Sequence, residues 1–215
     1  MMMSVALGCN AQSNRQLRDS IKIVNNTLAL YPDSVELRLL KASYNLQLEQ
    51  WEYAKNEYDE VIKRQPYNLT ALFYRAYSND KLGRHAFAHR DYETVLSYQP
   101  DNFEAQLGMA LVCQKEKLYT EAFDLMNRMV HQFPDSAIVY AIRAGIEKER
   151  NMLSLAEYDY SEAIIRDPQN TDYILNRADV RILEGKNKEA KDDLDTLLKL
   201  GVPRTGLIEY YRRCK

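Results

Sequence analysis

Two histidines, His85 and His89, stand four residues apart and have the spacing in this chain that most suggests a chemical site. On a helix this spacing puts both imidazole rings on one face, where they can share a metal ion. No His-Glu-x-x-His pattern or cysteine cluster accompanies them, and two ligands at a single spacing form a weak motif. The adjacent acids Asp192 and Asp193 are expected on a solvated helix face, with Asp193 paired to Arg177. We therefore predict no metal site and no catalytic residue.

Composition disfavours several other kinds of chemistry. The seven glycines are scattered and form no glycine-rich phosphate loop, so we expect no cofactor. The 29 basic and 31 acidic residues leave a formal charge of −2, whereas a nucleic-acid-binding protein needs a basic face. No stretch of sequence is long and apolar enough to span a membrane as a helix. These features predict a protein that is not an enzyme and does not bind nucleic acid.

The three cysteines do not form a disulfide framework. Cys113 is expected on a helix as a small buried residue. Cys214 lies next to the end of the chain and is expected to be exposed. Cys9 alone has a candidate chemical role, which depends on the sequence around it.

The prolines lie on one regular grid. Five of them are 34 residues apart, and the sixth follows 35 residues after the fifth. They are Pro32, Pro66, Pro100, Pro134, Pro168 and Pro203. A fixed period of this length is typical of a solenoid of helical hairpins, whose surface holds another molecule.

Two alanine series follow the same period and are offset from each other by 12 residues. The first is Ala42, Ala76, Ala110, Ala144 and Ala178, and the second is Ala54, Ala88, Ala122, Ala156 and Ala190. Small residues at two fixed places let two helix backbones approach closely. We therefore expect each period to form two helices joined by a tight turn.

The turns and the helix starts also recur. Between the alanines stand Glu49, Gly83, Lys117, Asn151 and Gly185. Glycine and asparagine suit the left-handed residue that ends a helix, and Glu and Lys adopt it less readily. Two residues after the prolines stand the predicted N-caps, Ser34, Asn68, Asn102, Ser136 and Asn170.

Two further positions of the period change together. Four periods place a cation 16 residues before an anion, as in Arg75 and Asp91, and the remaining period has Met109 and Leu125. The other pairs are Lys41 with Glu57, Arg143 with Asp159, and Arg177 with Asp193. We predict that these two side chains touch across each hairpin and fix its register.

These recurring residues resemble the tetratricopeptide repeat family, whose 34-residue pattern has a small residue at position 8, alanine at 20, an aromatic near 24 and proline at 32. The resemblance implies an all-α fold, a right-handed superhelical solenoid of helix-turn-helix units. Its five units are 35–68, 69–102, 103–136, 137–170 and 171–204. Residues 14–34 are then an N-terminal half-repeat helix, and residues 205–215 a C-terminal capping helix.

The chain departs from the family pattern at position 11, which is usually large and apolar. Here it is Asn45, Asn79, Cys113, Glu147 and Arg181. His85 falls at position 17, where the family packs an aromatic ring, and this placement further disfavours a metal role.

The first residues of the chain have two interpretations. Ala6-Leu7-Gly8-Cys9 resembles a bacterial lipoprotein cleavage and acylation site, which would make residues 1–13 a truncated signal and tether with Cys9 as the lipidation candidate. A signal peptidase cut after Ala11 is a variant of this interpretation. The apolar run is short and lacks a preceding Lys or Arg. Alternatively, residues 1–9 form the first helix of a sixth unit, with Gly8 at position 8.

The resemblance implies that first helices line a concave groove, with positions 5 and 9 forming a stripe. The candidate peptide-binding residues are Leu39, Phe73, Tyr77, Lys81, Leu107, Leu111 and Lys115. An apolar floor with a polar rim suits a bound helix or extended peptide. The small residues Ala141 and Gly145 leave room next to this apolar part of the groove. The same apolar residues could instead pack against neighbouring first helices.

A terminal-carboxylate clamp, known in chaperone-binding members of the family, is not expected because position 5 carries no lysine. Two classes of function remain. One is a non-catalytic adaptor that binds a peptide or helix of another protein in the groove. The other is a structural subunit that assembles through its convex face or ends. The lipoprotein resemblance implies a periplasmic or outer-membrane location, with a lipid as the only membrane contact, and the alternative location is cytoplasmic.

Overall fold

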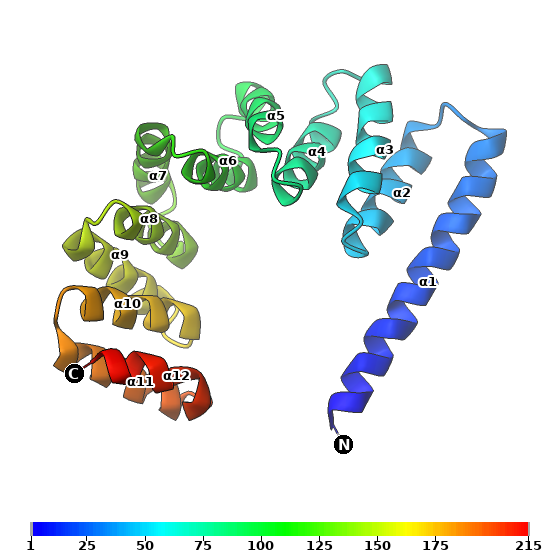
Figure 1. Cartoon of the computed structure of the whole chain (residues 1–215). Helices are drawn as coiled ribbons and strands as arrows, with labels where there is room; N and C mark the ends of the chain where they lie inside the picture. Colours follow the sequence, from blue (N-terminus) through cyan, green and yellow to red (C-terminus); the bar gives the residue numbers. More distant parts are fainter. Residues whose placement is uncertain (1, 215) are drawn as a thin grey trace. The chain divides into compact units, whose positions relative to one another are not determined.

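The computed structural model describes the backbone of residues 2–214 and the side chains of residues 13–214, and this part of the chain is entirely helical (Figure 1). Its helices are α1 (Met2–Leu30), α2 (Val35–Gln47), α3 (Trp51–Arg64), α4 (Leu69–Lys81), α5 (His85–Tyr98), α6 (Phe103–Lys115), α7 (Tyr119–Gln132), α8 (Ala137–Glu149), α9 (Leu153–Arg166), α10 (Thr171–Leu183), α11 (Asn187–Lys199) and α12 (Arg204–Arg213). The absence of strands in this part confirms the predicted all-α class.

The helices form two compact units, residues 1–112 and 113–215, with the boundary inside α6. Within the first unit each helix from α1 to α5 packs against the next one in the chain. Within the second unit the same holds from α7 to α12. This consecutive packing is the arrangement of a tetratricopeptide solenoid, in which contacts are made between sequence neighbours.

The alanines form the closest contacts of the fold. All ten alanines of the two series have no exposed surface. Beside them lie large side chains from the second helix of each hairpin, including Tyr58, Tyr92 and Met126, which are at most 2% exposed. Gly108 also leaves room for a ring, because a Cβ at this position would lie 2.5 Å from Cζ of Tyr92. Small residues on the first helices therefore make room for the rings of the second.

All five predicted turn residues adopt the left-handed conformation. Their φ angles are 56° at Glu49, 71° at Gly83, 61° at Lys117, 57° at Asn151 and 76° at Gly185. A side chain with a Cβ is strained there, by about 1 kcal/mol or more. Glu49 and Lys117 thus accept the conformation because the hairpin on either side imposes it.

Four of the five predicted N-caps are confirmed. Ser34, Asn68 and Asn102 accept hydrogen bonds from the backbone N–H three residues later, at 3.2, 3.0 and 2.9 Å. Asn170 accepts one from Asp172 at 3.2 Å. Ser136 also stands at its predicted place, the N-cap of α8, but its side chain makes no cap bond.

The predicted cation–anion pairs are present in all four hairpins. The distances are 2.7 Å for Lys41–Glu57, 2.6 Å for Arg75–Asp91, 2.5 Å for Arg143–Asp159 and 2.6 Å for Arg177–Asp193. The three arginines each make two hydrogen bonds to one carboxylate. In the remaining period, Met109 and Leu125 stand at the places of the cation and the anion, and both are buried. Asp193 is buried with Arg177, whereas its neighbour Asp192 is exposed.

The polar residues at position 11 are buried, although the family usually places a large apolar residue there. Asn45, Asn79 and Glu147 are 3%, 2% and 6% exposed. Burial raises the pKa of Glu147 to about 8, and the nearby charge of Asp159 and a hydrogen bond to it act in the same direction, against the opposing effect of Arg143. Glu147 is therefore held as a neutral acid near pH 7.

The two ends of the chain differ in their packing. α1 runs without interruption from Met2 to Leu30. The side chain of Cys9 lies outside the described residues. At the other end α12 packs on α10 and α11 through Leu207. The prediction that Cys214 is exposed is wrong, since the helix carries it into this apolar cluster, where it is 1% exposed.

Cys113 is buried, as predicted. None of the helices described here combines the length and the low polarity that crossing a bilayer requires.

The strained turns give a prediction about stability. Replacing Glu49 or Lys117 with glycine should raise the free energy of unfolding by about 1 kcal/mol each, because the strain of the left-handed conformation disappears. Gly83→Ala is the matched control and should lower it, since its φ of 71° is equally unfavourable for alanine. Urea denaturation followed by circular dichroism measures all three. A fall in stability for both glycine variants would show that these side chains stabilise their turns.

The neutral side chain of Glu147 gives a prediction about how stability depends on pH. Its pKa of about 8 in the folded protein lies above the ordinary value of 4.5, so the folded state holds a proton that the unfolded state loses. Stability should therefore fall as pH rises from about 5 to 8, by up to about 1.4 kcal/mol per pH unit from this group. Glu147→Gln should flatten this part of the profile, whereas the exposed Glu149→Gln should not. Parallel profiles for wild type and Glu147→Gln would contradict the assignment.

Candidate functional site

The predicted groove residues of α4 form part of an aromatic and cationic cluster. Tyr77 and Lys81 are one helical turn apart, and Lys81 Nζ lies 5.3 Å from the centroid of the Tyr77 ring. Trp51, at the start of α3, meets Tyr77 edge to face with ring centroids 5.8 Å apart. The same ammonium lies 6.0 Å from the Trp51 ring. We refer to Trp51, Tyr77 and Lys81 as the aromatic cluster.

The aromatic cluster is open to solvent. Tyr77 is 36% exposed, Lys81 is exposed and Trp51 is half-buried. A cation near aromatic faces is attracted by their quadrupoles, and such rings offer a rigid apolar surface to a ligand. Sequence reasoning missed Trp51, although it is the only tryptophan of the chain and stands at position 17, next to the turn that leads into α3.

Phe73 is less accessible than Tyr77. It is half-buried, and its ring meets the edges of Tyr74 and Tyr92 at centroid distances of 5.0 and 5.7 Å. Its remaining surface lines a cavity of about 320 Å³ with Leu69, Thr70 and other residues. Phe73 thus contributes to packing as well as to the surface.

The other predicted residues are distributed between core and surface. Leu39 is half-buried and packs on the apolar cluster of Ala42, Ala54 and Tyr58. Leu107 and Leu111, on α6, are also half-buried. Lys115 is exposed and belongs to the second compact unit. The structure therefore brings Tyr77 and Lys81 together on one surface and places Leu39 partly in the core.

The corresponding positions of the second unit carry less apolar surface. Ala141 is 8% exposed, and a Cβ at Gly145 would meet only the Tyr160 hydroxyl, at 3.7 Å. Asp179 is bridged by Lys148 and by Arg213, whose Nη1 donates to it at 2.7 Å. Burial opposes ionisation of Asp179, but its hydrogen bonds from Lys148 and Arg213 outweigh burial and lower its pKa. Its charge is thus balanced within the chain.

His85, one of the two histidines that stand four residues apart, contacts an aspartate of the preceding helix. Nδ1 of His85 lies 3.1 Å from Oδ1 of Asp80, at the turn between α4 and α5. This hydrogen bond links the last turn of α4 to the first residue of α5.

Comparison with known proteins agrees with this architecture. Residues 80–137 match a model of the tetratricopeptide repeat family. No curated protein matches the sequence. Among solved structures, a tetratricopeptide repeat protein from Parabacteroides merdae is similar over 94% of this chain and 79% of its own, at 18% identity and a TM-score of 0.71.

Two other solved structures are similar at comparable levels. MamA from Desulfovibrio magneticus, residues 41 to its end, matches 78% of this chain and 94% of its own, at 18% identity and a TM-score of 0.71. YrrB, described as a tetratricopeptide protein with an unusual peptide-binding site, matches 82% of this chain and 91% of its own, at 15% identity and a TM-score of 0.63. At these identities the likeness shows the fold. The helix packing and these structures show a tetratricopeptide repeat fold, and residues 80–137 match the family model itself.

Proposed function

We propose that this protein is a non-catalytic adaptor that binds a peptide or helix of another protein on the inner surface of its first unit. The observation that carries the proposal is the solvent-accessible aromatic cluster, which combines two rings and an ammonium group within 6.0 Å. Rigid aromatic side chains give large contact area at low entropic cost, and they are enriched where proteins bind each other. YrrB, which has the same fold, is described as having a peptide-binding site.

The chemistry of the cluster defines the ligand it suits. The Tyr77 and Trp51 rings would contact an apolar or aromatic side chain, and Lys81 would donate to a carbonyl or carboxylate oxygen. Half-buried Leu107 and Leu111 extend the apolar surface on α6. An amphipathic segment presenting one apolar anchor next to an acceptor meets these requirements.

A second candidate is a structural subunit that assembles through its second helices. The observation in its favour is a set of large apolar side chains exposed on those helices. In the first unit they include Tyr53 and Phe87, which are 65% and 57% exposed, and in the second unit Leu155 and Tyr158, which are 50% and 60% exposed. Such side chains are common at assembly surfaces, although single exposed apolar residues are also ordinary.

Surface variants distinguish these two functions. The double variant Tyr77→Glu/Lys81→Glu should abolish capture of the partner from a native cell extract, because it reverses the charge and removes a ring of the cluster. The matched variant Tyr53→Glu, on the second helix of the preceding hairpin, should retain it. Partners are identified by mass spectrometry, and calorimetry with the purified partner should show an affinity loss of at least about tenfold.

Circular dichroism establishes that each variant is folded. If the partner is lost from Tyr53→Glu and kept by the cluster variant, the groove proposal is overturned in favour of assembly through the second helices.

We also propose that Cys9 is acylated, which would hold the protein at a bacterial envelope membrane. The support is the sequence Ala6-Leu7-Gly8-Cys9. When the protein is expressed from its native gene, Cys9→Ser should move it from the membrane to the soluble fraction and abolish incorporation of a radiolabelled fatty acid. Cys214→Ser is the control and should change neither. Equal labelling of wild type and Cys9→Ser would refute acylation at this residue.

A further inference from the structure

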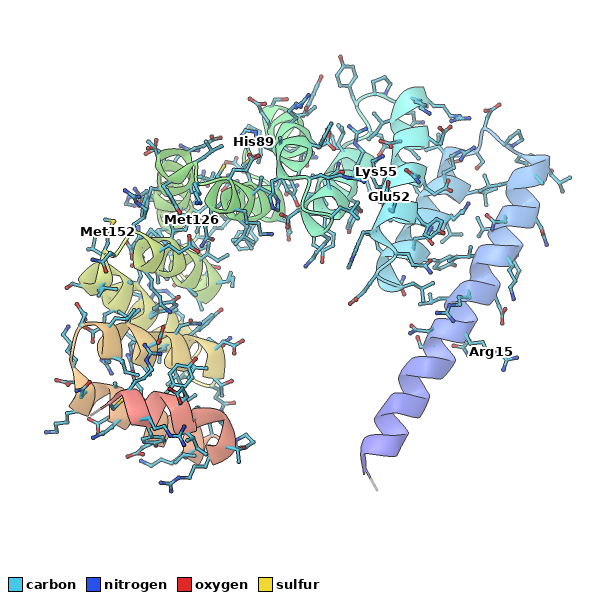
Figure 2. The ribbon with its side chains drawn as sticks, in the orientation of Figure 1. Arg15, Glu52, Lys55, His89, Met126 and Met152 are labelled. Atoms are coloured by element: carbon cyan, nitrogen blue, oxygen red, sulfur yellow. The ribbon has the colours of Figure 1, made fainter. Side chains whose placement is uncertain are left out.

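A second concavity of the first unit lies between α3, α4 and α5 and shares no residue with the aromatic cluster. It has a volume of about 380 Å³, within the range of ligand pockets. Its lining includes Lys55 from α3, Asn79 from α4, and Arg84, Phe87 and Arg90 from the turn and helix that follow. Figure 2 shows Lys55 on the flank of α3 that faces α4. We refer to this concavity as the basic pocket.

The basic pocket carries an excess of positive charge. Its lining includes four basic residues and the carboxylates of Asp59 and Asp91. Both carboxylates are bound by Arg75, at 2.9 and 2.6 Å, and Asp59 also pairs with Lys55 at 2.8 Å. Two guanidinium groups therefore remain to face an incoming ligand, those of Arg84 and Arg90.

The two remaining arginines are accessible. Arg84 pairs with Glu52 at 2.9 Å, but both side chains are more than 40% exposed, so water and salt weaken the pair. The Arg90 guanidinium lies 5.2 Å from the ring of Phe87, which is 57% exposed. The edge of the guanidinium can donate hydrogen bonds to a ligand, while the aromatic ring beside it offers the ligand an apolar face.

Asn79 provides a polar atom in the wall of the pocket. The residue is 2% exposed, and its Oδ1 atom is buried without a hydrogen-bond partner. A buried acceptor that lacks a donor costs free energy. A ligand that brings an N–H group into the basic pocket would recover that cost.

The second unit shows what fills the equivalent space. Three repeats further along the chain, Asn79 corresponds to Arg181, Arg84 to Lys186 and Lys55 to Glu157. There the Glu157 carboxylate accepts from Arg181 Nε at 2.7 Å and from Lys186 Nζ at 2.5 Å. The guanidinium of Arg181 also donates to Asp193 at 2.8 Å. The chain thus fills this place in the second unit with its own carboxylate.

The first unit keeps one cation of this arrangement, Arg84, and lacks its carboxylate, because Lys55 stands where Glu157 stands in the second unit. Asn79 is also shorter than Arg181 and leaves the space open. A carboxylate brought by another molecule would therefore meet Arg84, at the place from which Lys186 binds Glu157, together with the guanidinium of Arg90 in the same lining.

We propose that the basic pocket binds an acidic peptide segment of a partner protein. One glutamate or aspartate side chain of the segment is held by Arg84 and Arg90, with Lys55 beside them. A backbone N–H of the segment donates to Asn79 Oδ1, and an apolar side chain packs on Phe87. The basic pocket shares no residue with the aromatic cluster. An experiment can therefore contradict one of the two proposals and leave the other standing.

Nuclear magnetic resonance with a short acidic peptide tests the proposal. The probe is the tripeptide acetyl-Glu-Leu-Glu-amide, and acetyl-Gln-Leu-Gln-amide is its neutral counterpart. The acidic tripeptide should shift the arginine Nε–H signals of Arg84 and Arg90 and the backbone amide of Phe87, and the neutral one should not. Arg84→Glu/Arg90→Glu should weaken binding at least about tenfold. The exposed pair Arg128→Glu/Lys188→Glu makes the same change in net charge and should not.

Lys55→Glu keeps the arginines and gives the first unit the carboxylate that Glu157 supplies in the second, so it should also abolish binding. Tyr77→Glu/Lys81→Glu should leave it unchanged. Equal shifts with both tripeptides, or shifts that survive Lys55→Glu, would overturn the proposal. Inorganic phosphate at the same ionic strength provides the last comparison. If phosphate displaces the tripeptide at equal concentration, the pocket is a general anion site and the peptide proposal fails.

Discussion

Close contact between two helix backbones is the constraint on which every hairpin of this protein depends. Each hairpin places one alanine on its first helix and one on its second, and all ten are fully buried. Any larger side chain there would force the helices apart and remove the contacts of the neighbouring rings. Gly108 shows how strict this limit is, because even a methyl group would collide with Tyr92. The fixed period is the consequence, since each hairpin must repeat the same contact with the next.

The cation–anion pairs add specificity to this apolar contact. In three hairpins an arginine binds one carboxylate through two hydrogen bonds, and the carboxylate side chains of Asp159 and Asp193 are only 2% and 5% exposed. A buried pair gains little net stability, but the loss of one partner leaves an uncompensated charge. The pair therefore penalises any shift of one helix along the other. Met109 and Leu125 show that a hairpin can instead bury two apolar residues at these places.

Variation at the positions between these contacts gives the two units different surfaces. In the first unit, Trp51 and Tyr77 create an open aromatic surface on one side, and Asn79 leaves a basic pocket open on another. In the second unit, Arg181 and Glu157 fill the equivalent pocket, and Asp179 is neutralised by Lys148 and Arg213. The repeats share one framework, while the side chains between the repeated contacts differ from one unit to the other.

The sequence by itself determined the period, the places where the first helices begin, the five turns and the four ion pairs. These features depend on contacts between residues at a fixed spacing, which a repeated pattern reveals. Only the tertiary structure decided how side chains from different helices share a surface. It joined Trp51 to Tyr77 and Lys81, placed Leu39 partly in the core, buried Cys214 beneath the last helix and left the Asn79 acceptor unpartnered. Each of these depends on the volume and charge of neighbours that vary from repeat to repeat, and no spacing in the sequence specifies them.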